Sequence, residues 1–396
     1  MAKKGIPLSS GAPNPDDVIR LLDDLVVEAV RARASDIHLE PKEDRLRIRY
    51  RIDGVMSEQQ PLNQRISLPL ISRIKVLAQM DIAEKRQPQD GTFKIEVPRA
   101  GPVSLRASTF PCFEGEKMVL RVLRAGDLLS LDKLGMGKGQ LRQLRELANR
   151  TGGLMLVTGP TGSGKTSTLY ATLAELDTAR LNIVTLEDPM EVQLPDITQG
   201  QVNRRAGFTF SSGLRAILRQ DPDVILVGEM RDPETAAIAV QASLTGHLVL
   251  STLHTNSAIE SITRLIDIGL EPYVVANALV AIVSQRLVRR VCSACAQPYT
   301  LGRDVSEDVG FHIPPDSRFF RAMGCEQCLK TGFRGRTGIF EVVEVDDRMR
   351  TMIKRKAETH EIKEALRERG IPTLRRVGFQ AALQGKTTAA EVLRVT

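Results

Sequence analysis

The sequence has few aromatic residues and no tryptophan. Aromatic side chains make up 4% of its 396 residues, and this scarcity argues against a surface on which the bases of single-stranded nucleic acid would stack. No apolar run reaches the roughly 18 residues that a membrane-spanning helix needs. The opening stretch MAKKGIPLSSGAPNP lacks the apolar core of a secretory signal peptide. The sequence therefore predicts a cytoplasmic protein.

The composition is that of a folded globular protein. The hydrophobic and charged fractions are 42% and 26%, and the length allows two or three domains. The 55 basic side chains exceed the 48 acidic ones, which gives a formal net charge of +7. An anionic membrane surface or nucleic acid would suit this excess, but a solvated basic surface is its more frequent explanation.

The stretch LMLVTGPTGSGKTSTLYATL predicts a nucleotide site. Residues 154–157 have the character of a buried strand, residues 159–166 fit the pattern G-x-x-x-x-G-K-[ST], and a helix is expected from Thr166 onward. Backbone N–H groups of such a loop and the helix N-terminus face the phosphate oxygens. Lys165 is then expected to reach the β- and γ-phosphates of ATP, and the Thr166 hydroxyl to bind Mg²⁺. The predicted loop comprises Gly159, Pro160, Thr161, Gly162, Ser163, Gly164, Lys165 and Thr166.

The residues before this loop predict a small α+β domain at 16–124, preceded by a flexible lead at 1–15. Residues 45–52, RLRIRYRI, alternate apolar residues with four arginines, which predicts a half-buried strand that ends at the turn Asp53-Gly54. The arginine face is either solvated or contacts an anion or an acidic partner. Helices are expected at 16–34 and 68–80, and further strands at 92–97, 103–109 and 117–123, of which the last two carry Arg106 and Arg121.

Residues 125–138 contain three glycines and predict a linker to a second domain at 139–396. Strand and helix patterns alternate in that domain, which predicts a parallel sheet covered on both faces. Strands are expected at 182–186, 224–227 and 248–253, and helices in the C-terminal tail.

Acidic residues follow two of the expected strands. Glu187 and Asp188 come after one strand, and Glu229 comes after the next. Ligands of open α/β sheets bind beyond the carboxyl ends of the strands, so these side chains should point at the phosphate site. Acidic residues in such places are often helix caps, but Asp232 is the expected cap, which leaves Glu229 available for catalysis.

Two histidines and two arginines are further candidates. His247 and His254 flank one expected strand, which favours sensing of the γ-phosphate over a purely structural role. Arg215 and Arg219 are spaced to share one helix face, where they are either surface charges or phosphate ligands.

Four of the five cysteines form two C-x-x-C pairs. Cys292 and Cys295 make the first pair, and Cys325 and Cys328 make the second. This pattern favours a closed tetrahedral Zn²⁺ site over two disulfides or a redox pair. Cys112 is left over and is expected to be a buried thiol.

Several motifs together resemble the assembly ATPases of type II secretion systems and type IV pili. They are GPTGSGKTSTLY, LEDPMEVQ, GLRAILRQDPDVILVGEMRD, AVQASLTGHLVLSTLHTN, the paired C-x-x-C knuckles, and SDIHLEP with YRIDG in the first domain. The resemblance covers nearly the whole chain from residue 16 onward. Pilus retraction ATPases share the motor motifs but typically lack the four cysteines, which favours the assembly side.

The resemblance implies a PAS-like N-terminal domain and a RecA-like ATPase domain, with a zinc-binding insert at 288–336, assembled as a homo-hexamer. It implies that Glu187 and Asp188 form an acidic box, that Glu229 orients water or acts as general base, and that His247 and His254 form a histidine box. It further implies ATP, Mg²⁺ and Zn²⁺ as cofactors, inner-membrane platform proteins as partners, and a cytoplasmic protein attached peripherally to that membrane. Arg106 and Arg121 are expected to approach the nucleotide from the first domain.

One residue departs from the pattern of many P-loop enzymes. Gly228 stands where they carry a Mg²⁺-binding Asp, so the metal is expected to rely on Thr166 and on water-mediated contacts to the acidic box. Two other functions fit parts of the sequence. One is a nucleic-acid translocase or DNA-uptake motor, and the other is a scaffold whose loop senses nucleotide without turnover. Nucleic acid is not expected as a partner.

Overall fold

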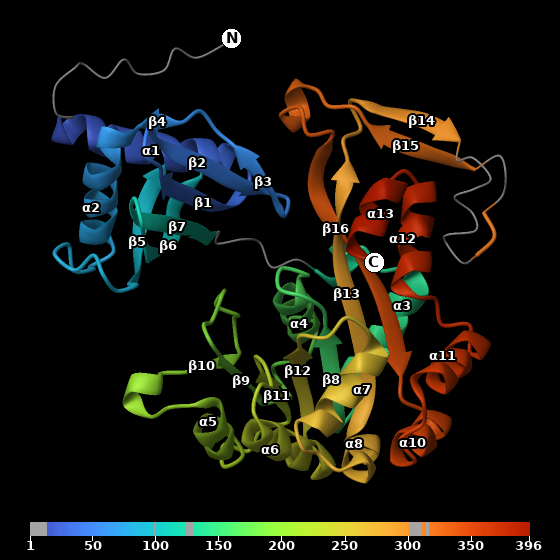
Figure 1. Ribbon diagram of the computed structural model, residues 1–396. Helices are drawn as coiled ribbons and strands as arrows, with labels where there is room; N and C mark the ends of the chain where they lie inside the picture. Colours follow the sequence, from blue (N-terminus) through green and yellow to red (C-terminus); the bar gives the residue numbers. More distant parts are fainter. Residues whose placement is uncertain (1–13, 99, 124–129, 301–310, 314–316) are drawn as a thin grey trace. The chain divides into compact units, whose positions relative to one another are not determined.

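The computed structural model describes residues 14–98, 100–123, 130–300, 311–313 and 317–396 (Figure 1). The chain divides into two compact units, Met1–Gly126 and Asp127–Thr396. Most of the predicted flexible lead, and residues 125–129 of the predicted linker, lie outside the described residues.

The first unit is an antiparallel sheet with the strand order β3-β2-β1-β7-β6-β5, in which β4 pairs with β2. Its elements in chain order are α1 (Pro15–Arg31), β1 (Ala34–Pro41), β2 (Arg45–Ile52), β3 (Val55–Glu58), β4 (Leu62–Asn63), the 3₁₀ turn η1 (Gln64–Ile66), α2 (Ser67–Leu77), β5 (Asp90–Val97), β6 (Gly101–Cys112) and β7 (Gly115–Leu123).

The alternation in β2 decides which side of this sheet is covered. Leu46, Ile48 and Tyr50 are buried in one core with the apolar faces of α1 and α2. The side chains between them point to the opposite side because successive strand residues alternate. We call that opposite side, which carries the arginines of β2, the open face.

The second unit is built on a sheet with the order β10-β9-β11-β12-β8-β13-β16. All neighbours pair in parallel except β13 with the edge strand β16. The elements are η2 (Leu131–Lys133), α3 (Lys138–Ala148), β8 (Gly153–Thr158), α4 (Lys165–Leu173), β9 (Ile183–Glu187), β10 (Thr198–Gln201), η3 (Arg204–Ala206), α5 (Phe210–Ile217), β11 (Val224–Val227), α6 (Pro233–Leu244), β12 (Leu248–Leu253), α7 (Ala258–Asp267), α8 (Pro272–Ala278), β13 (Leu279–Val291), β14 (Ala296–Thr300), β15 (Arg318–Ala322), η4 (Glu326–Cys328), β16 (Phe333–Glu344), α10 (Asp347–Lys354), α11 (Thr359–Glu368), α12 (Leu374–Leu383) and α13 (Ala389–Val395).

Both faces of this sheet are buried, as an apolar strand sequence such as GLMLVT requires. Leu154 and Leu156 of β8 belong to the core formed with α5 to α8, α10 and α11. Met155 and Val157 belong to a separate core formed with α3 and α4. The α/β fold predicted from alternating strands and helices is therefore confirmed.

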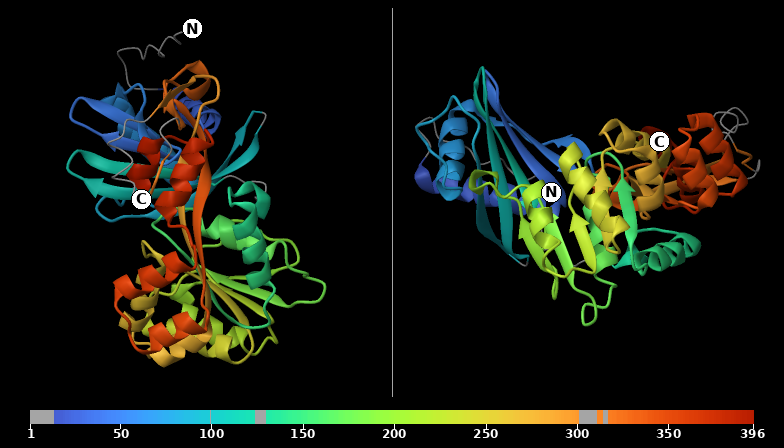
Figure 2. Two further views of the ribbon diagram at one scale, coloured as in Figure 1. Left: turned by 90° about the vertical axis from the view of Figure 1, so that its right-hand side faces the viewer. Right: turned by 90° about the horizontal axis from the view of Figure 1, so that it is seen from below.

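Strands β13 and β16 form a long antiparallel ribbon that ends at the small two-stranded sheet β14-β15 (Figure 1). A core of its own, which includes Phe319 and Phe379, joins this small sheet to α12 and α13. Figure 2 shows the red C-terminal helices beside the orange strand β16 from a second direction. This subdomain carries the four paired cysteines.

Two details differ from the sequence predictions. Strand β1 is absent from the sequence predictions, although Asp36 and Glu40 alternate there with apolar residues. Both charged side chains are nevertheless buried. The later part of the predicted linker is not a free connection, because Leu131 and Leu134 are buried in the core beneath α4. No helix among the described residues is both long and apolar enough to span a bilayer.

Candidate active site and tetracysteine site

The candidate active site lies where three neighbouring parallel strands end. Strand β8 leads into the loop that starts at Gly159, β11 leads through Gly228 to Glu229, and β12 leads to His254. These strands are adjacent in the order β11-β12-β8, so their carboxyl ends share one edge of the sheet.

The loop between β8 and α4 has a backbone that requires glycine. Gly162 and Gly164 have φ angles of 78° and 88°. A Cβ atom on Gly159 would lie 2.5 Å from the backbone carbonyl oxygen of Gln285. A Cβ atom on Gly164 would lie 2.8 Å from Nε2 of the Gln285 side chain. Within the described part of the chain, the buried Oγ of Ser163 has no hydrogen-bond partner. A loop shaped in this way, with an unpaired hydroxyl, fits a phosphate chain.

Lys165 lies folded onto this loop. Its side chain is 8% exposed, and its ammonium donates to the carbonyl oxygens of Gly159 at 2.9 Å and Pro160 at 3.2 Å. Burial lowers its pKa, while the nearby carboxylate of Glu229 acts in the opposite direction. A phosphate oxygen would replace these weak carbonyl acceptors with an anionic one, which is a stronger partner for an ammonium group.

Glu229 and His254 lie together at this edge. Oε2 of Glu229 is 3.6 Å from Nε2 of His254 and 2.6 Å from Nε of Arg231. Burial lowers the pKa of His254 and Lys165 lowers it further, although Glu229 opposes both effects. Burial and Lys165 therefore favour the neutral imidazole, in which one ring nitrogen is a donor and the other an acceptor.

The two residues of the predicted acidic box have different surroundings. Glu187 is 4% exposed and accepts hydrogen bonds from Thr185 at 2.7 Å, from Gln199 at 3.1 Å, and from the hydroxyl of Tyr170. Tyr170 belongs to α4, so Glu187 ties β9 to the helix that follows the phosphate loop. Asp188 pairs with Arg204 at 3.3 Å and is more exposed.

His247 lies far from this group within the subunit. His247 precedes β12, whereas His254 follows it, so the two histidines lie at opposite ends of the same strand. A strand rises by about 3.3 Å per residue, so the separation is roughly 20 Å. Nδ1 of His247 lies 3.0 Å from the carbonyl oxygen of Ala242 at the end of α6. Within one subunit only His254 lies beside Glu229, and a γ-phosphate-sensing role for both histidines stays a prediction.

The predicted helical arginines do not touch the phosphate loop of their own chain. Arg215 pairs with Glu234 at 3.0 Å on the surface, and Arg219 donates to the carbonyl oxygen of Arg215 at 2.7 Å. In the first unit, Arg106 lies 3.5 Å from Asp90, and Nε of Arg121 donates to Asp36 at 3.0 Å. Roles in phosphate binding stay predictions for all four arginines.

Sequence reasoning missed two polar residues near the loop. Gln285 is 1% exposed and accepts a hydrogen bond from Thr168 of α4 at 2.7 Å. Arg286 donates to the carbonyl oxygen of Asn256 at 2.9 Å, two residues beyond His254. Nothing in the local sequence signals these contacts, because they depend on β13 pairing beside β8.

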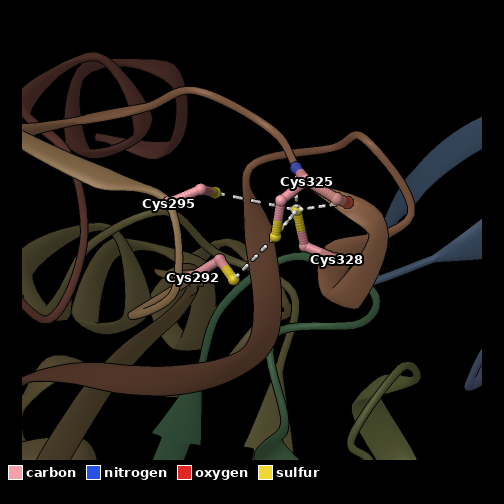
Figure 3. A group of neighbouring side chains, drawn as sticks. All are labelled: Cys292, Cys295, Cys325 and Cys328. Atoms are coloured by element: carbon pink, nitrogen blue, oxygen red, sulfur yellow. Dashed lines mark hydrogen bonds between the residues drawn. The ribbon is translucent and has the colours of Figure 1, made fainter.

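The second candidate site is the group of four cysteines at the end of the β13-β16 ribbon (Figure 3). Their sulfur atoms all lie within 4.8 Å of one another. The Sγ atoms of Cys292 and Cys325 are 3.9 Å apart, and those of Cys325 and Cys328 are 3.8 Å apart. Four thiolates around Zn²⁺ at about 2.3 Å would be separated by about 3.8 Å, whereas a disulfide needs about 2.05 Å. The spacing fits a tetrahedral metal site and not a pair of disulfides.

Backbone donors around the sulfur of Cys328 favour the thiolate form that metals require, whereas burial raises the pKa of Cys295 to about 11. The N–H groups of Cys325 and Gly332 both point at Sγ of Cys328 at 3.1 Å. Burial raises the pKa of Cys328, but these hydrogen bonds outweigh burial and bring it to about 6. Cys112 belongs to the first unit and is exposed, so its prediction as a buried thiol is wrong.

Comparisons with known proteins agree with this arrangement. A family model described as "Type II/IV secretion system protein" matches residues 13–394. Type II secretion system protein E of Pseudomonas aeruginosa is 49% identical over 380 residues, which are 96% of this chain and 75% of the relative. Type II secretion system ATPase E of Vibrio cholerae is 46% identical over 380 residues, with the same coverage of 96% and 75%.

Solved structures share the architecture. The pilus retraction motor PilT with bound ADP aligns with a TM-score of 0.64 and 27% identity over 95% of this chain and 96% of that chain. The ATPase DotB of Legionella pneumophila aligns with a TM-score of 0.71 and 19% identity over 98% of this chain and 97% of its own, which shows the fold alone. The resemblance and the fold class expected from the sequence are confirmed, and the chain belongs to the type II/IV secretion system protein family of ATPases.

Proposed function

We propose that this protein hydrolyses ATP as a ring-shaped homo-hexamer and so powers the assembly of a pseudopilus or type IV pilus for protein secretion at the inner membrane. One observation carries the proposal. Lys165, Glu229 and His254 converge at the ends of three adjacent strands, beside a loop whose backbone suits a phosphate chain. This arrangement supplies a phosphate cradle, a base and a polar sensor within one subunit.

The chemistry assigned to these residues is in-line attack of water on the γ-phosphate. Glu229 orients the water and accepts its proton, and Lys165 neutralises charge on the transferring group. Mg²⁺, held by the Thr166 hydroxyl and by waters bound to Glu187 and Asp188, would neutralise further charge when bound. His254 lies close enough to Glu229 to respond to the γ-phosphate that both would face.

Arginines complete the site from elsewhere. Arg215 and Arg219 do not touch the loop of their own chain, and Arg106 and Arg121 belong to the first unit. We assign all four to phosphate contacts made when subunits assemble, with His247 placed beside a neighbouring copy. This assignment accounts for why charged side chains of this kind lie on exposed surfaces.

The four cysteines are assigned to one structural Zn²⁺ per chain. The sulfur spacing supports this metal, and four protein ligands leave no open coordination position for catalysis. The zinc would fix the end of the β13-β16 ribbon against α12 and α13.

The cellular setting follows from the family. The relatives are named as secretion and pilus motor proteins, which favours protein secretion over nucleic-acid translocation. We assign the protein to the cytoplasmic side of the inner membrane, bound peripherally to platform proteins of a secretion or pilus system.

Steady-state hydrolysis of ATP by the purified chain tests this proposal. Turnover that rises more than linearly with protein concentration and disappears in Lys165→Ala is the expected result. Nucleotide binding without turnover would instead support the sensing scaffold. Tight DNA binding that falls steeply with salt at physiological ionic strength would support the translocase.

A further inference from the structure

The open face of the first unit is organised around two buried carboxylates. Asp36 and Glu40 both lie on β1, and their side chains point to the side of the sheet that α1 and α2 leave uncovered. They are nevertheless only 5% and 7% exposed, because basic side chains of the neighbouring strands cover them. The covering groups are Arg51 and Arg121 for Asp36, and Arg49 and Lys117 for Glu40.

Every oxygen of the Asp36 carboxylate is engaged. Oδ1 accepts the hydrogen bond from Nε of Arg121 at 3.0 Å. Oδ2 accepts from the hydroxyl of Ser35 at 2.8 Å and lies 3.7 Å from Nε of Arg51. The register of the sheet fixes this arrangement, since Asp36 stands directly opposite Arg51 on one side and Arg121 on the other.

Arg121 is bound through Nε, and its terminal nitrogens have no partner among the residues that the structure describes. Its Nε is bound to a carboxylate that is almost fully buried, yet 63% of its side chain is exposed. A guanidinium has one N–H on Nε and four on its terminal nitrogens. Since Asp36 binds Nε, the terminal nitrogens remain as the planar fork that matches two oxygens of a phosphate group.

We propose that Asp36 is a positioning residue that holds the Arg121 guanidinium in the orientation needed to meet the γ-phosphate. This inference rests on the proposed role of Arg121 as an arginine that reaches the nucleotide of an assembled ring. An exposed arginine on its own samples many rotamers, and fixing it on contact costs side-chain entropy. Asp36 removes part of that cost before the phosphate arrives.

Glu40 provides a matched control within the same strand. It faces the same side and binds two cations, accepting from Arg49 at 2.6 Å and from Lys117 at 2.9 Å. The side chains of those partners are 27% and 35% exposed, against 63% for Arg121. The Glu40 pairs are also shorter than the Asp36 pairs, so loss of the Glu40 charge should disturb the sheet at least as much as loss of the Asp36 charge, without releasing Arg121.

The test compares Asp36→Asn with Glu40→Gln in the full chain under assembly conditions. We expect Asp36→Asn to lower kcat by about tenfold, with KM for ATP equal to that of Glu40→Gln and a melting temperature no lower than that of Glu40→Gln. In an Arg121→Ala background, Asp36→Asn should lower kcat no further, because the group it positions is already absent. Glu40→Gln should change kcat by about twofold or less in either background.

Three outcomes would overturn the inference. They are an unchanged kcat in Asp36→Asn, a loss that adds fully to that of Arg121→Ala, and a loss matched by Glu40→Gln. Full activity in Arg121→Ala itself would instead remove the proposed role of that arginine, so the two failures are distinguishable. If Asp36→Asn does not fold, Ser35→Ala serves in its place. It removes one hydrogen bond to the carboxylate and should lower kcat by about twofold to threefold only when Arg121 is present.

Discussion

The Glu229 carboxylate lies 3.6 Å from Nε2 of His254, although 25 positions separate the two residues in the chain. The contact exists because β11 and β12 are parallel neighbours that end at the same edge. Arg231 binds the same carboxylate oxygen at 2.6 Å. Arg231 and His254 therefore hold the Glu229 carboxylate beside the phosphate loop, where a base that orients water must lie.

Glu229→Gln should bind ATP but lose hydrolysis. The amide keeps the size of the side chain and leaves the phosphate loop intact, but it removes the charge that orients and deprotonates water. We expect kcat to fall by about 100-fold or more with nucleotide affinity nearly unchanged. Steady-state ATP hydrolysis measures kcat, and binding of a fluorescent nucleotide measures the affinity. Glu146→Gln, on the exposed side of α3, is the control, and near-normal turnover in Glu229→Gln would refute the assignment.

Arg121→Ala should impair hydrolysis only in the assembled protein. An arginine that arrives from another part of the ring stabilises the transition state, so kcat should fall by about 100-fold while monomer affinity for nucleotide stays the same. Arg106→Ala should act in the same direction. Mixing Arg121→Ala with Lys165→Ala subunits should restore some activity, because each supplies what the other lacks at a shared site. Full activity of both arginine variants, singly and combined, would exclude the first unit from catalysis.

Protein purified without chelators should contain about one Zn²⁺ per chain. Cys292→Ser should lose the metal, lower the melting temperature and expose residues 292–328 to proteolysis, because metal affinity contributes directly to folding of such sites. Nucleotide affinity should remain, since no cysteine belongs to the phosphate loop. Cys112→Ser should retain full zinc content as a control. Elemental analysis that finds no zinc in the unaltered protein would contradict the assignment.

Glu391 should make stability depend on pH in the acid range. Burial opposes its ionisation, but hydrogen bonds from Arg394 and Arg289 outweigh burial and lower its pKa from 4.5 to about 2. A lowered pKa stabilises the fold above the unfolded value, so this contribution is complete above pH 4.5 and is lost as the pH falls toward 2.

Glu391→Gln should therefore lower stability at pH 7 by about 3 kcal/mol, and the difference from the unaltered protein should shrink below pH 4.5. Melting temperatures measured from pH 7 to pH 3 check this. Glu361→Gln removes an exposed pair with Arg355 and should change little at any pH. A difference between Glu391→Gln and the unaltered protein that is constant with pH would exclude the charge as its cause.

Features that depend on neighbouring residues were predictable from the sequence. The phosphate loop at 159–166 is one of them, because the glycine positions and the helix that follows are properties of a short backbone segment. The alternation in β2 and the buried runs in β9, β11 and β12 are others, since side-chain direction repeats along a strand regardless of its partners. The spacing of the cysteines within each C-x-x-C pair is also local, and it predicted the tetracysteine site. The four sulfur atoms do lie within 4.8 Å of one another.

Features that depend on strand order and register were decided by the tertiary structure. Only the pairing of β11 with β12 brings His254 to Glu229, and only the pairing of β13 with β8 brings Gln285 beneath the loop. Asp36 is buried and binds Arg121 because β1 lies between β2 and β7, although 85 positions separate the two residues in sequence. Hydrophobic packing across the whole sheet selects such pairings, and no local pattern records which distant strand will become the neighbour.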